Sequence, residues 1–461
     1  MVAQRIFVET RGLPSALINR IKRLAAFQNP EFFKKQKMHL STALTPRVIA
    51  CFEDLPEHVA LPRGCFDALR ELLNEHDIHL SVVDKLQNGA PCTHIFHGTL
   101  TAVQQQAVKE LLKHDIGIFV APPGSGKTVV GAYLTAARHC STLVLVHRKP
   151  LLDQWVAQLS QFLDLPKKEI GTIGSGKSKP TNVLDVAMIQ SLVRKHEVSD
   201  LIAGYGQVIV DECHHLPAVS FERVLSEVKA RYVVGLTATP YRRDGNQAII
   251  HLQCGPTRFS LHRKQHSQDE SFVRRLIVRE TSFTLPATDS GITIQELYAR
   301  LSTDRQRNQI ILDDIRQTLA EGRSPILLTE RKDHLEFFAE NLRETVRHMV
   351  VLHGGMGTKK RRAVMDQLAA IPDDEERLIL ATGRYIGEGF DDARLDTLFL
   401  ALPISWKGML VQYAGRLHRQ YSGKEEVRVH DYMDNSVPML GKMHNKRMRG
   451  FRAMGYIQVQ E

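Results

Sequence analysis

The stretch GIFVAPPGSGKTVVGAYLTAARH, residues 117–139, decides the fold of the N-terminal half of this chain. It opens with an apolar run typical of a buried strand and then passes through a glycine-rich loop. After the loop, the chain continues without proline or any other cluster that would break a helix. We therefore predict a strand, a loop and a helix, in which the loop amides and the positive end of the helix can bind phosphate groups.

The loop matches the phosphate-loop pattern G-x-x-x-x-G-K-[ST] at every position except the first, where Ala121 replaces glycine. Alanine fits there if the backbone needs no positive φ. We expect Lys127 to contribute charge at the β and γ phosphates of ATP and Thr128 to supply a hydroxyl for Mg²⁺. The amides that cradle the phosphates would come from Gly124, Ser125 and Gly126.

A complete match to the same pattern, GTIGSGKS, lies at residues 171–178 and ends at Lys177 and Ser178. Pro180 follows, and proline disfavours a helical conformation at the residue before it. Another apolar run, VLDVAMI, begins directly afterwards. Because this context indicates strand, turn and strand, we predict a hairpin here and place the nucleotide at the incomplete match.

An acidic motif follows the apolar run at residues 208–210. Asp211 and Glu212 come directly after this predicted strand, and ligands lie at the carboxyl ends of strands in open α/β sheets. We expect Asp211 to hold Mg²⁺, directly or through water, and Glu212 to polarise the attacking water. An isolated Asp-Glu pair is common, but Cys213 and His214 extend this one to D-E-C-H.

With this tetrapeptide the sequence resembles the superfamily 2 helicases of the DExH type, and further motifs of that family follow in order between about residues 100 and 434. The resemblance implies that Gln104, in LTAVQQQAV, recognises adenine. It implies that GLTATP links the ATP site to the nucleic-acid track through Thr237, Ala238 and Thr239. It also implies nucleic-acid contacts by His147, Arg148 and Gln190.

The second half of the chain carries the later motifs of the same family. In LILATGRYIGEGFD, the resemblance places Thr382 toward nucleic acid and Gly389 and Asp391 toward the nucleotide. In QYAGRLHR, it implies a coupling role for Gln412. Arg416 and Arg419 would approach the γ phosphate from the second domain as arginine fingers, with ATP bound between the two domains.

Within the superfamily, the sequence is most similar to the XPB-like DNA helicases, and its tail also resembles helicases of bacterial defence systems and mobile elements. XPB-like proteins carry Arg-Glu-Asp just after the third motif, where this chain has Arg242, Arg243 and Asp244. Arginine in place of glutamate reverses a charge in the element to which the family owes strand separation. We expect Arg242 and Arg243 to contact nucleic acid.

Alternation of apolar runs with helical stretches predicts an α/β protein with two tandem RecA-like parallel-sheet domains and a small N-terminal α+β domain. We expect an accessory domain over residues 1–98, which weakly resembles the DNA-engaging domain of XPB-like proteins and could equally be a packing or partner-docking domain. The first RecA-like domain would span residues 99–254, a connector or small insertion 255–303, and the second RecA-like domain with a basic tail 304–461.

The net charge of +10 is expected of a protein that binds a polyanion. Basic residues concentrate in KKRR at 359–362 and in GKMHNKRMRGFR at 441–452, each of which is either a solvated helix face or a phosphate contact. No apolar run is long enough for a membrane span, and six scattered cysteines suit a reducing cytoplasm. The only metal-like spacing, Cys92, His94 and His97, lacks an evident fourth ligand.

Three functions fit these observations. The first is an ATP- and Mg²⁺-dependent DNA helicase or translocase, with DNA favoured over RNA by the XPB-like resemblance. The second is a DNA-stimulated ATPase that remodels or recruits a partner without unwinding. The third is the motor subunit of a restriction or defence complex whose nuclease is another chain. A small-molecule kinase with a phosphate loop is a further alternative, against which the second set of motifs argues.

Overall fold

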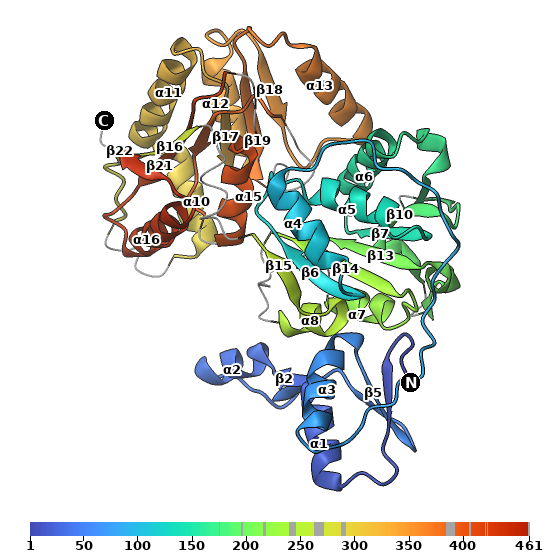
Figure 1. The fold of residues 1–461 in the computed structure, drawn as a ribbon. Helices are drawn as coiled ribbons and strands as arrows, with labels where there is room; N and C mark the ends of the chain where they lie inside the picture. The colour runs from blue at the N-terminus through green and yellow to red at the C-terminus, as the bar shows by residue number, and fades with distance from the viewer. Residues whose placement is uncertain are drawn as a thin grey trace. The chain divides into compact units, whose positions relative to one another are not determined.

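The computed structural model of the chain describes residues 1–174, 176–194, 197–214, 218–238, 246–261, 272–286, 292–383, 392–404, 407–419, 421 and 423–459. The chain forms two compact units, residues 1–261 and 262–461, and each is built around one large sheet (Figure 1). Within the ranges just given, no helix combines the length and the apolar character that crossing a membrane requires.

The first unit contains an eight-stranded sheet in the order β15-β6-β14-β13-β7-β10-β8-β9. Every pairing in this sheet is parallel except that of β8 with β9. Its strands are β6 (Ile116–Val120), β7 (Thr142–Val146), β8 (Gly171–Gly174), β9 (Lys177–Lys179), β10 (Leu184–Met188), β13 (Gln207–Asp211), β14 (Tyr232–Thr237) and β15 (Thr257–Ser260).

Helices cover both faces of the first sheet (Figure 1). One face carries α4 (Ala102–Leu111), α5 (Lys127–Ala137) and α6 (Lys149–Phe162), and the other carries α7 (Ala218–Leu225) and α8 (Ala248–Cys254). Alternate residues of each strand enter two separate cores: Val208 and Val210 of β13 join one, and Ile209 joins the other. A strand buried on both faces is apolar throughout, which is why these strands appear in the sequence as continuous hydrophobic runs.

The second unit is a seven-stranded, fully parallel sheet in the order β18-β19-β17-β20-β21-β16-β22. Its strands are β16 (Val273–Glu280), β17 (Pro325–Thr329), β18 (Met349–Leu352), β19 (Leu378–Thr382), β20 (Thr397–Leu400), β21 (Glu426–Met433) and β22 (Ile457–Val459). Its helices are α10 (Ile294–Thr303), α11 (Arg305–Ala320), α12 (Lys332–Leu342), α13 (Thr358–Ala370), α15 (Lys407–Leu417) and α16 (Pro438–Ala453). Two tandem parallel-sheet domains confirm the predicted fold class.

The segment 255–303 is more than a connector. Its first part forms β15, which pairs with β6 in the first sheet, and its later part forms β16, which pairs with β21 in the second. Helix α10 follows and packs its buried leucines with residues of the second unit. The sequence patterns did not predict these two strands, because β15 has only four residues and β16 contains three arginines.

The N-terminal residues form a small α+β fold within the first unit. The antiparallel strands β1 (Ile6–Glu9), β5 (His58–Leu61) and β4 (Glu53–Asp54) make one sheet, and β2 (Ala26–Gln28) pairs with β3 (Val48–Ala50). Three helices accompany these strands: α1 (Ser15–Leu24), α2 (Pro30–Lys37) and α3 (Phe66–Asn74). The apolar residues of this fold belong to the same core as one face of the eight-stranded sheet.

Arg63 and Gly64, in a short 3-10 turn, attach the N-terminal fold to the first sheet. The Arg63 side chain is buried, and its guanidinium donates to the carbonyls of Ala230 and Arg231, the latter at 2.7 Å. Gly64 lies so close to α8 that a Cβ there would stand 2.0 Å from the carbonyl oxygen of His251. The attachment therefore depends on one buried cation and on the absence of one side chain.

We predict that Arg63→Met weakens this attachment. Methionine retains most of the buried volume but leaves two buried carbonyls without a donor, which costs about 2 to 4 kcal/mol and lowers the first thermal unfolding midpoint by roughly 5 to 10 °C. Differential scanning calorimetry measures this shift. Arg70→Met is the matched control, because Arg70 is exposed and its ion pair with Asp67 is 3.7 Å long. Equal midpoints in both variants would contradict the prediction.

Candidate ATP site

The phosphate loop lies between β6 and α5, as predicted. Gly124 and Gly126 adopt positive φ angles of 86° and 78°, whereas Ala121 is not among the described residues with positive φ. The amide of Ala121 instead donates to the carbonyl of Thr237 at 2.9 Å, and its side chain is fully buried. Alanine is therefore tolerated at the first loop position because the backbone there needs no left-handed conformation.

Gln104 holds the loop from outside. Its side-chain oxygen accepts from the amide of Thr101 in a capping box at the start of α4, and its Nε2 donates to the carbonyl of Ser125 at 3.0 Å. A Cβ on Gly126 would stand 2.3 Å from that Nε2. The glutamine that the family resemblance assigns to adenine thus also fixes the shape of the loop in this structure.

Lys127 and Glu212 meet at the centre of the candidate site. The Lys127 Nζ lies 3.1 Å from the carbonyl oxygen of Ala121 and 3.7 Å from Oε1 of Glu212. Both side chains are largely buried, with 10% and 17% of their surfaces exposed. The ammonium group predicted to bind phosphates is thereby held inside the loop by a carbonyl and by the carboxylate predicted to polarise water.

His214 extends this contact toward Thr237. Its Nδ1 lies 3.3 Å from Oε2 of Glu212 and 2.7 Å from Oγ1 of Thr237, and its side chain is 2% exposed. The four side chains of Lys127, Glu212, His214 and Thr237 form a continuous polar chain, which we call the site chain. It joins the loop after β6 to the carboxyl ends of β13 and β14.

The backbone at Glu212 is strained. Its φ of 45° lies in the left-handed region, which L-residues other than glycine enter at a cost of about 1 to 3 kcal/mol. Strain of this kind persists only where surrounding contacts impose it. Glu212 contacts Lys127 and His214 in this left-handed conformation.

Asp211 is buried and accepts hydrogen bonds from Trp155 Nε1 at 2.8 Å and from the amide of Glu212 at 3.0 Å. Burial and the neighbouring Glu212 carboxylate raise the pKa of Asp211, and the Trp155 hydrogen bond opposes that shift. Trp155 reaches Asp211 across α5 at Gly131, where a Cβ would stand 2.5 Å from the indole ring. The sequence patterns do not reveal this contact between Trp155 and the carboxylate expected to hold Mg²⁺.

The residues of this site fit ATP with Mg²⁺. Two glycines with positive φ shape the loop, the Gln104 side chain leaves no room for a Cβ on Gly126, and Lys127 supplies a cation. Thr128, the second residue of α5, and Asp211 would hold Mg²⁺, which when bound neutralises charge on the phosphate oxygens. Hydroxyl and carboxylate oxygens are the ligands that Mg²⁺ prefers.

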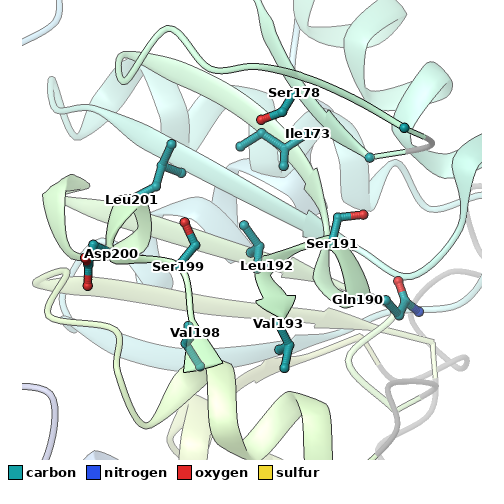
Figure 2. A pocket seen from close by; sticks show the side chains of 12 residues that line it. Ile173, Ser178, Gln190, Ser191, Leu192, Val193, Val198, Ser199, Asp200 and Leu201 are labelled. Atoms are coloured by element: carbon teal, nitrogen blue, oxygen red, sulfur yellow. The ribbon is translucent and has the colours of Figure 1, made fainter. Parts of the chain in front are cut away.

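The complete phosphate-loop match forms a hairpin, which confirms the prediction of strand, turn and strand. Strands β8 and β9 pair antiparallel, with Ile173 opposite Ser178. A cavity of about 780 Å³ lies between this hairpin and a second one, formed by β11 (Val193–Arg194) and β12 (Glu197–Val198) (Figure 2). Gln190 lines the same cavity, and its Nε2 donates to the carbonyl of His147 at 3.1 Å. Two residues expected to contact nucleic acid therefore lie together, at the ends of β7 and β10.

The later motifs converge within the second unit. Thr382 ends β19, while Gln412 and Arg416 lie on α15 and Arg419 follows that helix. Gly383, next to Thr382, lies so close to α15 that a Cβ would stand 2.4 Å from the hydroxyl of Tyr413. The structure thus brings the start of LILATGRYIGEGFD and the helix of QYAGRLHR together at Gly383.

Five predicted site residues lie outside the described ranges. They are Thr239, Arg242, Arg243, Gly389 and Asp391. Ala238 is described and follows β14 directly, and Arg148 is exposed after His147. The functional roles given to all of these residues stay predictions.

The cysteines of the chain are buried free thiols. Cys92, which begins the metal-like spacing with His94 and His97, donates from its Sγ to the carbonyl of Ala90 at 3.6 Å. In the part of the chain that the structure describes, no three His, Cys, Asp or Glu side chains group in a way that could hold a metal ion.

Two known protein families match the chain, one within each of its two units. Residues 97–242 match the family described as type III restriction enzyme, res subunit, and residues 306–420 match the helicase conserved C-terminal domain. A putative ATP-dependent RNA helicase of Acanthamoeba polyphaga mimivirus is 24% identical over 372 residues, covering 78% of this chain and 69% of the relative. A DNA 3'-5' helicase XPB of Kineococcus radiotolerans is 27% identical over 278 residues, covering 58% of this chain and 48% of the relative.

A solved structure of an ATP-dependent type ISP restriction-modification enzyme bound to DNA is similar with a TM-score of 0.55 and 16% identity, covering 79% of this chain and 31% of that one. At this identity the likeness shows the fold alone. Fold, site and matched families together define an ATP-hydrolysing motor of the helicase type that acts on nucleic acid. The two domain matches, together with XPB helicases among the relatives, support a superfamily 2 helicase of the XPB-like type, as the sequence motifs predicted.

We predict that Lys127→Ala abolishes ATP hydrolysis, because it removes the cation that lies in the phosphate loop. Lys177→Ala should leave the rate nearly unchanged, since Lys177 lies in the β8–β9 hairpin. Steady-state ATPase assays of the two variants provide the measurement, and each serves as the other's control. An inactive Lys177→Ala variant with an active Lys127→Ala variant would reverse the assignment of the loop.

We predict that Trp155→Phe shifts the acid limb of the pH–rate profile to higher pH. The raised pKa of Asp211 rises further without its indole donor, so a smaller fraction of the carboxylate is ionised at low pH. The ATPase rate should fall roughly tenfold near pH 6 and much less near pH 8. Tyr205→Phe is the control, because it removes a hydrogen bond to the buried Asp185 elsewhere in the same sheet. A pH-independent loss in Trp155→Phe would argue for packing alone.

Proposed function

We propose that this chain is an ATP-dependent DNA translocase or helicase, in which hydrolysis at the first unit drives movement along DNA. The observation that carries the proposal is the site chain, because it connects the phosphate-binding lysine to the motif assigned to coupling through 3.7, 3.3 and 2.7 Å contacts. Such a connection gives a group that senses the presence of phosphates a route by which to act on Thr237.

Each residue has a proposed chemical role. The loop amides and Lys127 bind the phosphates and stabilise negative charge on them. Glu212 orients the attacking water and accepts its proton, while Asp211 holds Mg²⁺ with Thr128. The second unit contributes Arg416 and Arg419, which stabilise charge in the transition state and are worth about 10³ to 10⁵ in rate. Gln104 recognises adenine and reports its presence to the loop.

ATP binding is proposed to be coupled to nucleic acid through a change in the hydrogen-bonding partner of Lys127. Without phosphates, Lys127 is held by the Ala121 carbonyl and by Glu212. Phosphates attract Lys127 more strongly than a carbonyl does, which frees Glu212 to act as base and lets His214 shift its hydrogen bonding between Glu212 and Thr237. Thr237 ends β14 and precedes the segment predicted to touch nucleic acid, so this shift reaches the track.

DNA is proposed as the track because the XPB-like branch is composed of DNA helicases by name. The viral relative is named as an RNA helicase, so RNA is the competing substrate. The free cysteine thiols support a cytoplasmic site of action. Residues 1–98 are proposed to be an accessory domain that engages DNA or docks a partner.

A second candidate is the motor of a restriction or defence complex that lacks unwinding activity of its own. The match of residues 97–242 to a restriction-enzyme family and the fold likeness to a restriction-modification enzyme favour it. Unwinding of a labelled duplex supports the first candidate. Co-purification of a nuclease, together with DNA-stimulated ATPase and no unwinding, supports the second.

We predict that duplex or single-stranded DNA stimulates ATP hydrolysis, that RNA does so less, and that Lys127→Ala removes the stimulated rate. Contacts to several phosphates release counterions, so DNA affinity should fall by orders of magnitude between about 50 and 200 mM salt. ATPase assays with each nucleic acid and anisotropy titrations over that range provide the test. Stronger stimulation by RNA would overturn the choice of DNA, and affinity indifferent to salt would overturn backbone tracking.

A further inference from the structure

Helix α16 carries several cations and no acidic residue along its whole length. Four of the cations are exposed. At 100° per residue, they fall within a sector of roughly 120° and span about 15 Å of the helix axis. We call these residues the α16 basic row: Lys442, Lys446, Arg449 and Arg452.

The opposite face of α16 is locked in place. Asp431 of β21, which is 1% exposed, accepts from Arg447 Nε at 2.6 Å and from His444 Nδ1 at 2.8 Å. A second Arg447 nitrogen donates to the same carboxylate at 3.1 Å. Gly450 packs so tightly on α15 that a Cβ would stand 2.6 Å from Leu410. These contacts fix the rotation of the helix and hence the direction in which the basic row points.

Several exposed lysines on other helices form an ion pair with a carboxylate three or four positions away. Within the described residues, no such ion pair involves a member of the α16 basic row. The paired examples are Lys35 with Glu31 at 2.7 Å, Lys113 with Glu110 at 2.6 Å and Lys332 with Glu336 at 3.0 Å.

Unpaired like charges at this spacing are unfavourable. Cations three or four residues apart on a helix repel by a few tenths of a kcal/mol each, and the row contains three such neighbouring pairs. Helix α16 has no acidic residue to neutralise these charges, whereas an array of phosphates would do so and release counterions. The row is therefore complementary in charge to a polyanion.

We propose that the α16 basic row binds the phosphate backbone of duplex DNA, as a contact of the second unit separate from the helicase motifs. The phosphates of a duplex strand recur at a fixed rise of about 3.4 Å along the duplex axis, so a row of about 15 Å can approach several phosphates at fixed positions. The contacts of α16 fix the direction of the row, and the duplex fixes the positions of its phosphates. Binding therefore does not have to order a flexible strand, which favours duplex over single-stranded DNA. The inference rests on the proposed DNA-directed function.

The helix that carries the α16 basic row packs against α15, which carries residues of the helicase motifs. Gly450 of α16 lies against Leu410 of α15, and α15 carries Gln412 and Arg416. Because α16 itself contains none of the residues assigned to ATP, we expect the row to set the affinity for duplex DNA and not the maximal rate of hydrolysis.

The test replaces the four cations together, as Lys442→Gln, Lys446→Gln, Arg449→Gln and Arg452→Gln. Binding of the full chain to a short blunt duplex is measured by fluorescence anisotropy between about 50 and 200 mM salt. The slope of log K against log salt should become shallower by about two to four, at about 0.9 per phosphate contact, and affinity should fall at least tenfold near 100 mM. The ATPase rate at saturating duplex should be unchanged, with more DNA needed for half-stimulation.

The matched control removes four exposed cations elsewhere on the same unit: Arg305→Gln, Lys332→Gln, Arg343→Gln and Arg347→Gln. Its net charge equals that of the test variant, so a general electrostatic effect would weaken both alike and overturn the proposal. A third variant exchanges lysine and arginine within the row and should retain binding. Equal losses on single-stranded DNA would overturn the duplex assignment, and a loss confined to anionic phospholipid vesicles would replace DNA by a membrane surface.

The outcomes for the unaltered chain separate this inference from the proposed function. If the unaltered chain neither binds duplex DNA nor is stimulated by any DNA, the proposed function fails. If it binds and is stimulated while the test and control variants behave alike, the function stands and only the role of the α16 basic row fails.

Discussion

The contact between Lys127 and Glu212 is the constraint on which the candidate site depends. The two residues follow β6 and β13, which are separated in the sheet by β14. Their 3.7 Å approach requires the register that pairs Thr237 with Val120 and Asp211 with Leu236. A slip of one residue would turn every side chain to the opposite face of the sheet. The apolar strands therefore do more than form a core, because their register aligns the loop, the carboxylates and the coupling threonine.

The two neighbouring carboxylates of the site, Asp211 and Glu212, have different electrostatic surroundings. Asp211 is buried beside Trp155, and its pKa is raised mainly by burial, whereas Glu212 lies between Lys127 and His214. Such unequal surroundings suit the proposed division of roles, in which one carboxylate holds a metal and the other activates water. The Trp155 indole, Lys127 and the Glu212 amide all oppose the rise in the pKa of Asp211.

Much of this arrangement could be predicted from local sequence. The order of strand, glycines and helix along the chain indicates the incomplete loop, and Pro180 disfavours the helix that the complete match would need. What could not be predicted depends on residues far apart in sequence. Trp155 and Asp211 are 56 positions apart, and Arg63 and Ala230 are 167 apart, so no pattern in a short window reveals either contact. The two strands within 255–303 escaped notice because their sheet partners, not their own residues, define them.

The positive net charge of the chain can be related to binding only by asking where the charged side chains lie. Two interior arginines of the second unit are paired with carboxylates: Arg307 bonds Asp434 at 3.0 Å, and Arg447 bonds Asp431 at 2.6 Å. Removing one partner of such a buried pair costs several kcal/mol, whereas an exposed pair contributes little. At the surface, some helix lysines also have a carboxylate within one turn, as Lys113 and Lys332 do. On α16 the same helix shows both behaviours, with paired cations facing inward and uncompensated cations facing outward. Because the inward pairs fix the helix, the outward charge has a defined direction, which is what distinguishes a binding surface from a merely basic one.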